Sequence, residues 1–312
     1  MILAINMNPA IDKVYAVDDF KVGEVFRPRD MTATAGGKGL NVARVACLLG
    51  EQVIATGLAG GSTGRFIEEE VKKQGIDSQF VPIQGESRIC INIMDEKNVT
   101  STEILEPGPT ISEEECEAFL NKYQKLLEKC DVVTASGSLP KGVPEDFYRN
   151  LISLANEKGK KFILDTSGKY FEEGINEKPY MIKPNKDEVS KVIKESLSHM
   201  DDYIKAVKTF QAQGIMLPVI SLGKNGCIAA LEDGIYHFTT PQVKVINTVG
   251  SGDSFVAGCA VGLSQGRNFI DVIKLGMACG TANTQFFKTG MVSKELVDKF
   301  FAMIEYEKIE GI

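Results

Sequence analysis

Short runs of β-branched and aliphatic residues alternate with longer amphipathic stretches along most of this chain. Runs this apolar are typical of strands buried on both faces, as in a parallel sheet, and parallel strands need crossover connections that are usually helical. The alternation therefore predicts an α/β fold with a mostly parallel sheet. The predicted strands are 2–7, 53–58, 132–135, 162–164, 181–182 and 219–222, and the predicted helices are 40–49, 66–74, 112–129, 144–156 and 201–213.

Two segments, 13–34 and 88–106, lack the alternation with helices. In the second, residues 89–94 and 100–105 look like the strands of a hairpin with no helix after them. We expect both segments to form a small sheet outside the main one, a lid of about residues 12–35 and 87–106 inserted in a single domain, 1–312. The end of the chain predicts a hairpin over 226–238 with its turn at Asp233-Gly234, a strand at 243–247, and helices at 252–263 and 269–287.

The composition limits the classes of partner. A chain of 312 residues with 43% hydrophobic and 25% charged residues can bury a full core, and its net charge of −7 comes without a Lys/Arg block, so nucleic acid is not an expected partner. No apolar stretch approaches the roughly 20 residues that span a bilayer, and no secretory signal opens the chain, so we expect a cytoplasmic protein that does not enter a membrane. Seven widely spaced cysteines, mostly in apolar runs, predict buried free thiols.

The most informative stretch is a glycine-rich turn, within residues 247–258, that follows a predicted strand and opens a predicted helix. Gly250 and Gly252 permit the backbone angles of an anion-binding nest, and the helix N-terminus adds partial positive charge. Asp253 would then lie beside a bound phosphoryl group. It could accept a proton from a hydroxyl while the turn, with Ser251, stabilises charge on the phosphoryl oxygens. The turn therefore predicts phosphoryl transfer with Asp253 as general base.

Other interpretations of this turn are available. Asp253 could simply cap a helix. A dinucleotide fingerprint would need glycine where Phe255 stands, and a P-loop would need Ser or Thr after Gly-Lys, where Gly39 and Asn225 follow instead. A hydrolase using Ser254 would need a histidine base, and neither of the two histidines has a context that resembles one.

A second turn of small residues, Gly36-Gly37-Lys38-Gly39, also leads into a helix, with Asn41 close behind. Its glycines would let a ligand approach the main chain closely. Alone, such a turn could be a flexible corner of the chain. Combined with the Asp253 turn, it predicts a second part of the same substrate site.

The two turns, Gly-Gly-Lys-Gly-x-Asn at 36–41 and Asn-Thr-x-Gly-Ser-Gly-Asp at 247–253, resemble the two signatures of the PfkB carbohydrate kinases. The similarity continues through residues 8–12, 136–140, 183–188 and 221–226, and is greatest to the branch of 1-phosphofructokinases and tagatose-6-phosphate kinases. Asn247 and Ser251 stand where the family often has Asp and Ala, and both keep the anion nest. The resemblance implies a ribokinase-like three-layer α/β/α sandwich, Rossmann-like with a mostly parallel sheet, and a small β-sheet lid.

The resemblance also implies roles for individual residues. The sugar hydroxyls would be held by Asp12, Gly37, Lys38 and Asn41. The phosphate already on the substrate would be held by Arg88 and faced by Ser138 and Lys141. ATP would be bound by Lys183, Asn185, Ser221, Gly223 and Gly226, with Ala278 and Asn283 at the adenine. Glu188 would act on Mg²⁺ through water.

The activity implied by the resemblance is ATP- and Mg²⁺-dependent phosphorylation of a ketohexose monophosphate, tagatose 6-phosphate or fructose 1-phosphate, to the 1,6-bisphosphate. A monovalent cation such as K⁺ would be a further cofactor. Lid closure would exclude water from the γ-phosphate, and a homodimer through the lid is the expected assembly. Two alternatives stay open: a kinase for a non-phosphorylated sugar or nucleoside, and a sensor that binds sugar phosphate without turnover.

Overall fold

The computed structural model describes residues 1–98, 100–194 and 197–311. Its main sheet has the strand order β15-β14-β13-β12-β11-β10-β9-β1-β4-β5, with β6 beside β4. From β12 to β5 the neighbouring strands run parallel, and β13, β14 and β15 extend the sheet in antiparallel fashion. The strands are β1 (Ile2–Asn6), β4 (Val53–Gly60), β5 (Asp77–Ser78), β6 (Val81–Ile83), β9 (Val132–Ser136), β10 (Lys161–Asp165), β11 (Met181–Ile182), β12 (Leu217–Ser221), β13 (Cys227–Leu231), β14 (Gly234–Thr239) and β15 (Glu305–Gly311).

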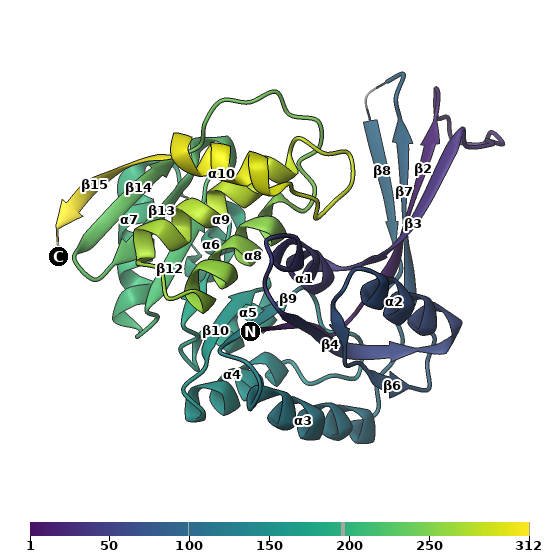
Figure 1. Cartoon of the computed structure of the whole chain (residues 1–312), viewed down its shortest axis with the longest axis horizontal. Helices are drawn as coiled ribbons and strands as arrows, with labels where there is room; N and C mark the ends of the chain where they lie inside the picture. Colours follow the sequence, from purple (N-terminus) through teal and green to yellow (C-terminus); the bar gives the residue numbers. More distant parts are fainter. Residues whose placement is uncertain (99, 195–196, 312) are drawn as a thin grey trace.

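Helices cover both faces of this sheet, which confirms the three-layer prediction (Figure 1). Alternate residues of β1 show the division, because Ile2 and Ala4 pack in one core while Leu3 and Ile5 pack in the other. The first core is covered by α1 (Lys38–Leu48), α2 (Gly61–Lys73), α8 (Ser251–Ser264), α9 (Phe269–Asn283) and α10 (Lys294–Met303). The second is covered by α3 (Glu113–Leu127), α4 (Phe147–Glu157), α5 (Lys169–Ile175), α6 (Lys186–Ile193) and α7 (Met200–Ala212).

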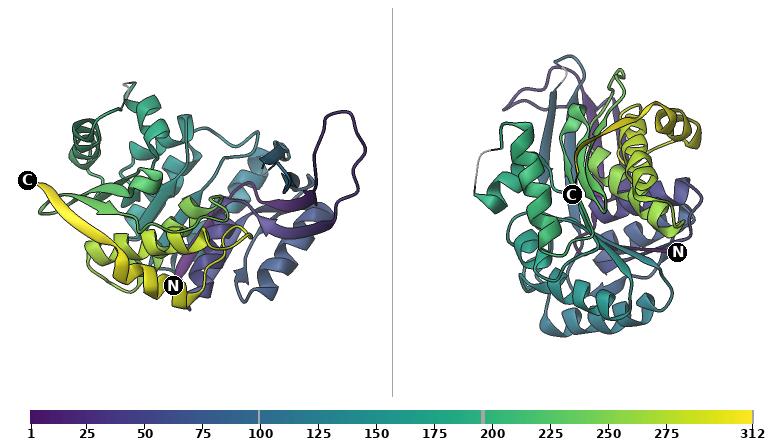
Figure 2. Two further views of the ribbon diagram at one scale, coloured as in Figure 1. Left: turned by 90° about the horizontal axis from the view of Figure 1, so that it is seen from above. Right: turned by 90° about the vertical axis from the view of Figure 1, so that its left-hand side faces the viewer.

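A second, four-stranded sheet stands to one side of the main one (Figure 1). We call it the lid sheet; its strands, in order, are β3 (Asp30–Gly36), β2 (Ala10–Val17), β7 (Arg88–Asp95) and β8 (Thr100–Leu105). The inner pair, β2 and β7, is parallel, and the two outer pairs are antiparallel. The loop between β2 and β3 protrudes beyond the rest of the molecule, as the left view of Figure 2 shows.

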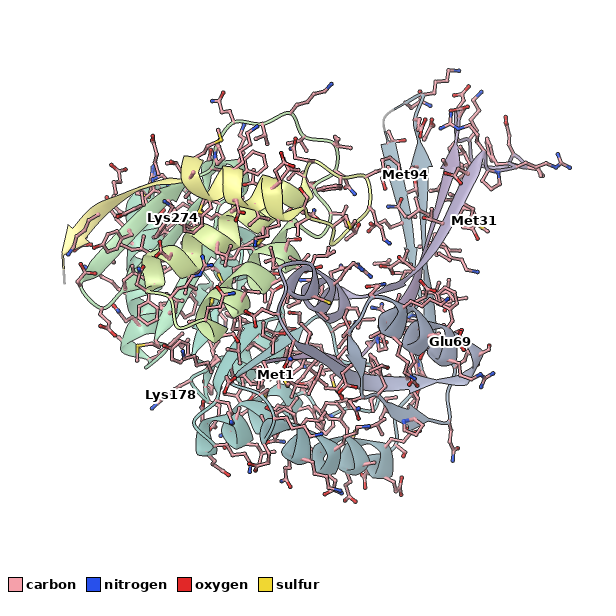
Figure 3. The ribbon with its side chains drawn as sticks, viewed as in Figure 1. Met1, Met31, Glu69, Met94, Lys178 and Lys274 are labelled. Carbon is pink, nitrogen blue, oxygen red and sulfur yellow. The ribbon has the colours of Figure 1, made fainter. Side chains whose placement is uncertain are left out.

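The two faces of the lid sheet differ in their surroundings. Met94 and Met31 belong to opposite faces, because Met94 is in register with Ala16 whereas Met31 is in register with Tyr15. Figure 3 labels Met94 on β7 and Met31 on β3, two strands of the lid sheet. The face that carries Met94 is directed at the main body. The other face packs on α2 near Ile11 and is exposed further out, at Met31.

Two local predictions were wrong. Residues 243–247 form no strand; the main-chain N–H groups of Ile246 and Asn247 both donate to the carbonyl of Thr284, at 2.8 and 3.3 Å, instead of to a neighbouring strand. The last predicted helix ends at Asn283, four residues early, where the Thr284 hydroxyl bonds back to the carbonyl of Thr281 at 2.7 Å.

Two further observations on the described residues concern the helices and the cysteines. None of the described helices has the length and apolar character needed to cross a membrane. All seven cysteines are free, and six of them are buried, Cys47 being partly exposed.

Candidate active site

A cleft of about 1660 Å³ lies between the lid sheet and the main sheet, at the carboxyl ends of the parallel strands. This edge is where α/β sheets commonly bind ligands. We call its main-sheet side the floor: the ends of β1, β10, β11 and β12 and the first turn of α8. Most of the residues predicted for substrate, catalysis and nucleotide line this one cleft: Asp12, Gly37, Lys38, Asn41, Arg88, Ser138, Lys183, Asn185, Glu188, Ser221, Gly223, Gly226, Gly250, Ser251, Gly252 and Asp253.

The glycine-rich turn forms the start of α8. Gly250 is the N-cap residue with φ of 80°, a left-handed conformation that favours glycine, and an added Cβ would lie 2.4 Å from Thr289 Cγ2. Among the described residues, no side chain caps this helix N-terminus. At Gly252 an added Cβ would be 3.5 Å from Lys183 Nζ. The Ser251 N–H donates to the Thr248 carbonyl at 3.2 Å. The N-terminus of α8 nevertheless faces the cleft next to a cation, an arrangement that suits an anion.

Asp253 lies in the first turn of α8 and is only 6% exposed. Its Oδ2 accepts a hydrogen bond from Asn41 Nδ2 at 2.8 Å. Burial, together with the nearby carboxylate of Asp165, raises the pKa of Asp253 to about 6, against the lowering effects of Lys38, the Asn41 hydrogen bond and Lys183. A carboxylate with this pKa is mostly ionised at neutral pH and is a better proton acceptor than an ordinary Asp.

Sequence reasoning missed Asp165, which organises the charges around Asp253. It ends β10, is 3% exposed, and lies between two lysines: Lys183 Nζ is 3.3 Å from its Oδ1, and Lys38 Nζ is 3.8 Å from its Oδ2. The Asp165 charge raises the pKa of Lys38, outweighing burial. Lys38 therefore stays cationic beside Asp253. An acidic residue directly after the apolar strand 162–164, before Thr-Ser-Gly, was the signal available in the sequence.

The Gly36-Gly37 turn is shaped by its neighbours. A Cβ on Gly36 would lie 2.0 Å from Asp12 Oδ2, and one on Gly37, where φ is 105°, would lie 2.3 Å from Asn6 Nδ2. Burial raises the pKa of Asp12, although the charges of Arg44 and Arg88 and a hydrogen bond from the Gly37 N–H oppose the rise. The two glycines thus bring the main chain against a carboxylate and an amide that both face the cleft.

The lid contributes two rows of side chains to the cleft. Cross-strand register places Asp12, Cys90 and Leu105 in one row and Val14, Asn92 and Glu103 in the next, and all six line the cleft. Arg88, at the start of β7, donates through Nε to the carbonyl of Asn8 at 3.0 Å and through Nη1 to that of Glu106 at 3.2 Å. Two carbonyls thus hold this guanidinium at the edge of the cleft.

The residues predicted to bind the nucleotide lie across the floor from the lid. Asn185 and Glu188 form a capping box at the start of α6: Asn185 Oδ1 accepts from the Glu188 N–H at 2.9 Å, and Glu188 Oε2 accepts from the Asn185 N–H at 2.8 Å. Both residues still line the cleft. Gly226 has φ of 85° and its Cβ would lie 1.8 Å from the carbonyl oxygen of Phe238, so the 223–226 turn requires glycine there.

Three of the predicted residues do not line this cleft. Lys141 lies outside it, and its carbonyl accepts from the Ile111 N–H at 2.8 Å. Ala278 is fully buried in the core. Asn283 is 1% exposed and is used inside the protein, because its Nδ2 donates to the Val249 carbonyl at 2.9 Å. The residues that line the cleft here are Met277, Gly280 and Thr281 of α9 and Thr284, which directly follows the helix.

The donor set fits Mg²⁺ bound through phosphates and water. Within the described residues, no three His, Cys, Asp or Glu side chains come together to hold a metal ion. Mg²⁺ usually keeps several waters and takes one or two carboxylates plus substrate phosphates, so it needs no such cluster. Glu188 faces the cleft on the nucleotide side and can supply one carboxylate.

Comparison with known proteins finds carbohydrate kinases that match nearly the whole chain. A family model described as pfkB family carbohydrate kinase matches residues 5–294. The tagatose-6-phosphate kinase of Staphylococcus epidermidis is 41% identical over 311 residues, which cover 98% of this chain and 99% of that one.

Solved structures are similar over the whole chain as well. A possible 1-phosphofructokinase of Thermotoga maritima has a TM-score of 0.90 at 30% identity, covering 99% of both chains. Phosphofructokinase-2 of Escherichia coli in complex with potassium has a TM-score of 0.90 at 25% identity, covering 97% of this chain and 98% of that one. The same Escherichia coli enzyme has been solved in a tetrameric inhibited form. These similarities include both sides of the cleft.

Proposed function

Because the chain belongs to the pfkB family of carbohydrate kinases, we propose that it transfers the γ-phosphoryl group of Mg·ATP to a ketohexose monophosphate, forming a 1,6-bisphosphate and ADP. The family assignment makes it a phosphotransferase with an alcohol group as acceptor. The observation that carries the proposal is Asp253, a buried carboxylate with a raised pKa beside the open N-terminus of a helix.

In the proposed reaction Asp253 accepts the proton of the attacking hydroxyl. The hydroxyl oxygen then bonds to the γ-phosphorus as the bond to the bridging oxygen of ADP breaks. The N–H groups of the turn at Gly250, Ser251 and Gly252, with Lys183 beside them, stabilise the charge on the transferred group. Mg²⁺, when bound, neutralises charge on the ATP phosphates, and Glu188 is the residue we propose to hold it through water.

The two walls of the cleft support an acceptor with a phosphate at one end and a free hydroxyl at the other. Arg88 would hold the phosphate, and Asp253 would receive the hydroxyl proton, while Asp12, Lys38 and Asn41 would hold the hydroxyls between them. Tagatose 6-phosphate and fructose 1-phosphate both have this form, with the accepting hydroxyl at the opposite end of the carbon chain. The 41% identity to a tagatose-6-phosphate kinase makes tagatose 6-phosphate the first acceptor to test.

The remaining parts of the proposal concern ATP, ions, assembly and location. Lys183, Asn185, Ser221, Gly223 and Gly226 would hold the nucleotide, with the α9 side chains that face the cleft at the adenine. The relative solved with potassium supports a role for K⁺. Free thiols throughout the chain fit the cytoplasm.

A homodimer through the lid sheet is supported by the exposed outer part of one face of that sheet, the face that packs on α2 near its base. Register places Tyr15, Ile93, Ile104 and Met31 on this face, and Ile104 and Met31 are 55% and 57% exposed. Apolar side chains gathered on an open sheet are typical of an interface. The protruding loop adds Val22, which is 97% exposed.

The test is ADP release from Mg·ATP with tagatose 6-phosphate, fructose 1-phosphate, fructose 6-phosphate, fructose and ribose, for the wild type and Asp253→Asn. Asp298→Asn, an exposed carboxylate on α10, is the matched control. We expect turnover with a phosphorylated ketohexose in the wild type and the control and its loss in Asp253→Asn. Turnover with free sugar would remove the proposed role of Arg88, and ligand binding without turnover would indicate a sensor.

A further inference from the structure

Arg44 is a buried cation behind the cleft to which the proposed reaction gives no role. It lies on α1, one turn after Asn41, and is only 5% exposed. A guanidinium is buried at this depth only when its donors are paired. Its Nε donates to Gln74 Oε1 at 3.0 Å, its Nη2 donates to the carbonyl of Ala35, and its Nη1 donates to Asn41 Oδ1 at 2.9 Å and to the carbonyl of Thr289 at 3.2 Å.

The bond from Arg44 determines which end of the Asn41 amide faces the base. A guanidinium has donors and no acceptor, so it selects Oδ1 of the amide. Nδ2 is then left to donate to Asp253 Oδ2 at 2.8 Å. In the opposite orientation the amide NH₂ would face a cation and the amide oxygen would face a carboxylate, and both contacts would be unfavourable.

A second chain of contacts leads from Arg44 to the glycine-rich turn at residues 249–252, which we call the anion-binding turn. The Thr289 carbonyl accepts from Arg44, and the next residue, Gly290, donates its N–H to Asn283 Oδ1 at 2.9 Å. Asn283 Nδ2 donates in turn to the carbonyl of Val249, at the start of the turn, at 2.9 Å. An added Cβ on Gly290 would lie 2.9 Å from Arg44 Nη1, so the loop is packed directly on the guanidinium.

We propose that Arg44 is a positioning residue for phosphoryl transfer, which holds Asp253 through the amide of Asn41, the anion-binding turn through the loop at 289–290, and the base of the lid through Ala35. The inference rests on the proposed function, but the contacts of Arg44 do not depend on which sugar is accepted. Arg44 itself does not line the cleft, so it acts only through its neighbours.

The protonation of Asp253 provides a readout that a purely structural role would not move. The Asn41 hydrogen bond favours the ionised form of Asp253, and so does a cation at Arg44. Loss of Arg44 should therefore raise the pKa of the Asp253 carboxyl. The charged groups facing this pair from the surrounding elements are Lys38, Asp165 and Lys183 around Asp253, and Asp12, Glu70 and Lys288 around Arg44. None of them is changed by the variants below.

The kinetic test compares Arg44→Met, which removes the charge and the fork of donors, with Arg44→Lys, which keeps the charge but cannot hold both Asn41 and Ala35. The control is Arg149→Met on α4, an arginine 48% exposed and paired with Glu177. We expect kcat to fall about 10- to 100-fold in both Arg44 variants, as for loss of a hydrogen bond to a charged group. The acid limb of kcat/KM should move to higher pH in both, and neither should change in the control. Unchanged profiles in folded Arg44 variants would contradict the proposal.

A second measurement without substrate separates this inference from the proposed function. The ¹³C signal of the Asp253 carboxyl, assigned by its loss in Asp253→Asn, is titrated in each protein. We expect a midpoint at about 6 in the wild type and higher midpoints in both Arg44 variants. Arg44→Met should shift the midpoint less in an Asn41→Ala background than in the wild type. Equal midpoints, or an equal shift in both backgrounds, would overturn the positioning role whether or not the enzyme accepts a sugar phosphate.

Discussion

The floor and the lid form the two walls of one cleft, but they are built in opposite ways. On the floor, Asp253, Asp165 and Lys183 are 6%, 3% and 5% exposed, and each is held by buried polar partners. On the lid, every residue of β8 is exposed, and Leu105, which faces the cleft, is 61% exposed. A buried polar network keeps one geometry because each lost bond is costly, whereas an exposed strand can shift without opening a core. We infer that the floor performs the chemistry and that the lid selects the substrate.

The largest effect is expected on the floor, from Asp253→Asn. Loss of a general base should lower kcat by about 10²- to 10⁴-fold, with KM for both substrates nearly unchanged. ADP release and both KM values test this, with Asp298→Asn as control. An Asp253→Asn enzyme that keeps more than a tenth of wild-type kcat would contradict the role of Asp253 and with it the assignment of chemistry to the floor.

The same variant should change stability in a pH-dependent way. The pKa of Asp253 is raised from 3.8 to about 6 on folding, so between these values the folded protein keeps a proton that the unfolded chain has released. Stability therefore falls as pH rises through this window, and the deficit persists above it. Asp253→Asn should be more stable than the wild type above pH 6, by on the order of 3 kcal/mol, and should lose this advantage near pH 4. Denaturant unfolding at both pH values measures it.

Two glycines of the anion-binding turn separate activity from stability on the floor. Gly252→Ala places a methyl group at ordinary contact distance, 3.5 Å from Lys183 Nζ, in a helical position, so it should leave stability unchanged or raise it by up to about 1 kcal/mol. The methyl group would occupy the proposed phosphoryl site, and kcat should fall by about 10²- to 10³-fold, the range for a lost transition-state contact.

Gly250→Ala is the matched variant, and unlike Gly252→Ala it should lower the stability of the protein. Its φ of 80° and a Cβ only 2.4 Å from Thr289 Cγ2 should cost at least about 1–2 kcal/mol of stability. Thermal unfolding and kcat are measured for both proteins. If Gly252→Ala lost stability while keeping its activity, the turn would be structural and not the anion site.

The lid should respond in KM instead of kcat. Arg88→Gln removes the guanidinium that two carbonyls hold at the edge of the cleft, so KM for the sugar phosphate should rise by about 10- to 100-fold, as for a lost charged hydrogen bond, with KM for ATP unchanged. Arg29→Gln, which removes an arginine paired with Glu96 elsewhere on the lid, is the control. A fall in kcat at constant KM would place Arg88 in the chemistry and remove the contrast between the two walls.

The division between the walls also explains what sequence could predict. The turns at Gly36-Gly37 and Gly250-Gly252 were found because a glycine requirement is local and appears in the sequence itself. Arg44 was missed because its meaning depends on distant partners: its bond to the Thr289 carbonyl spans 245 positions. A buried arginine on a helix also looks the same in sequence as an exposed one.

Two differences between the sequence predictions and the structure have another origin, the orientation of an element. Ala278 and Asn283 were assigned to the adenine by resemblance, but the direction in which a helical residue points depends on how the helix packs. In α9 that packing turns Met277 and Thr281 to the cleft and Ala278 to the core. The sequence of residues 243–247 predicted a strand. The main-chain N–H groups of residues 246 and 247 instead donate to a carbonyl at the end of α9, and the segment is irregular.

The smallest effect is expected at the tip of the lid, where Asp95 binds two loops together. Its carboxylate accepts from the main-chain N–H groups of Asp19 at 2.9 Å and Phe20 at 2.7 Å, in the β2–β3 loop, and from that of Lys97 at 3.1 Å in the β7–β8 turn. Burial alone would raise the pKa of Asp95, but the hydrogen bonds from Asn98 and these N–H groups hold it well below its usual range. The contribution of Asp95 to stability is therefore present above its ordinary pKa and is lost as pH falls.

Asp95→Asn should loosen the tip without reaching the floor. We expect faster hydrogen exchange of the amides at 19–20 and 97–98, a rise of a few-fold in KM for the sugar phosphate, and unchanged kcat, because the carboxylate is replaced by a group that accepts fewer and weaker hydrogen bonds. Asp18→Asn, an exposed carboxylate in the same loop that is 3.9 Å from Arg29, should change none of these. If Asp95→Asn lowered kcat as much as Asp253→Asn does, the tip of the lid would be part of the catalytic geometry, and the floor could no longer be treated as a separate rigid unit.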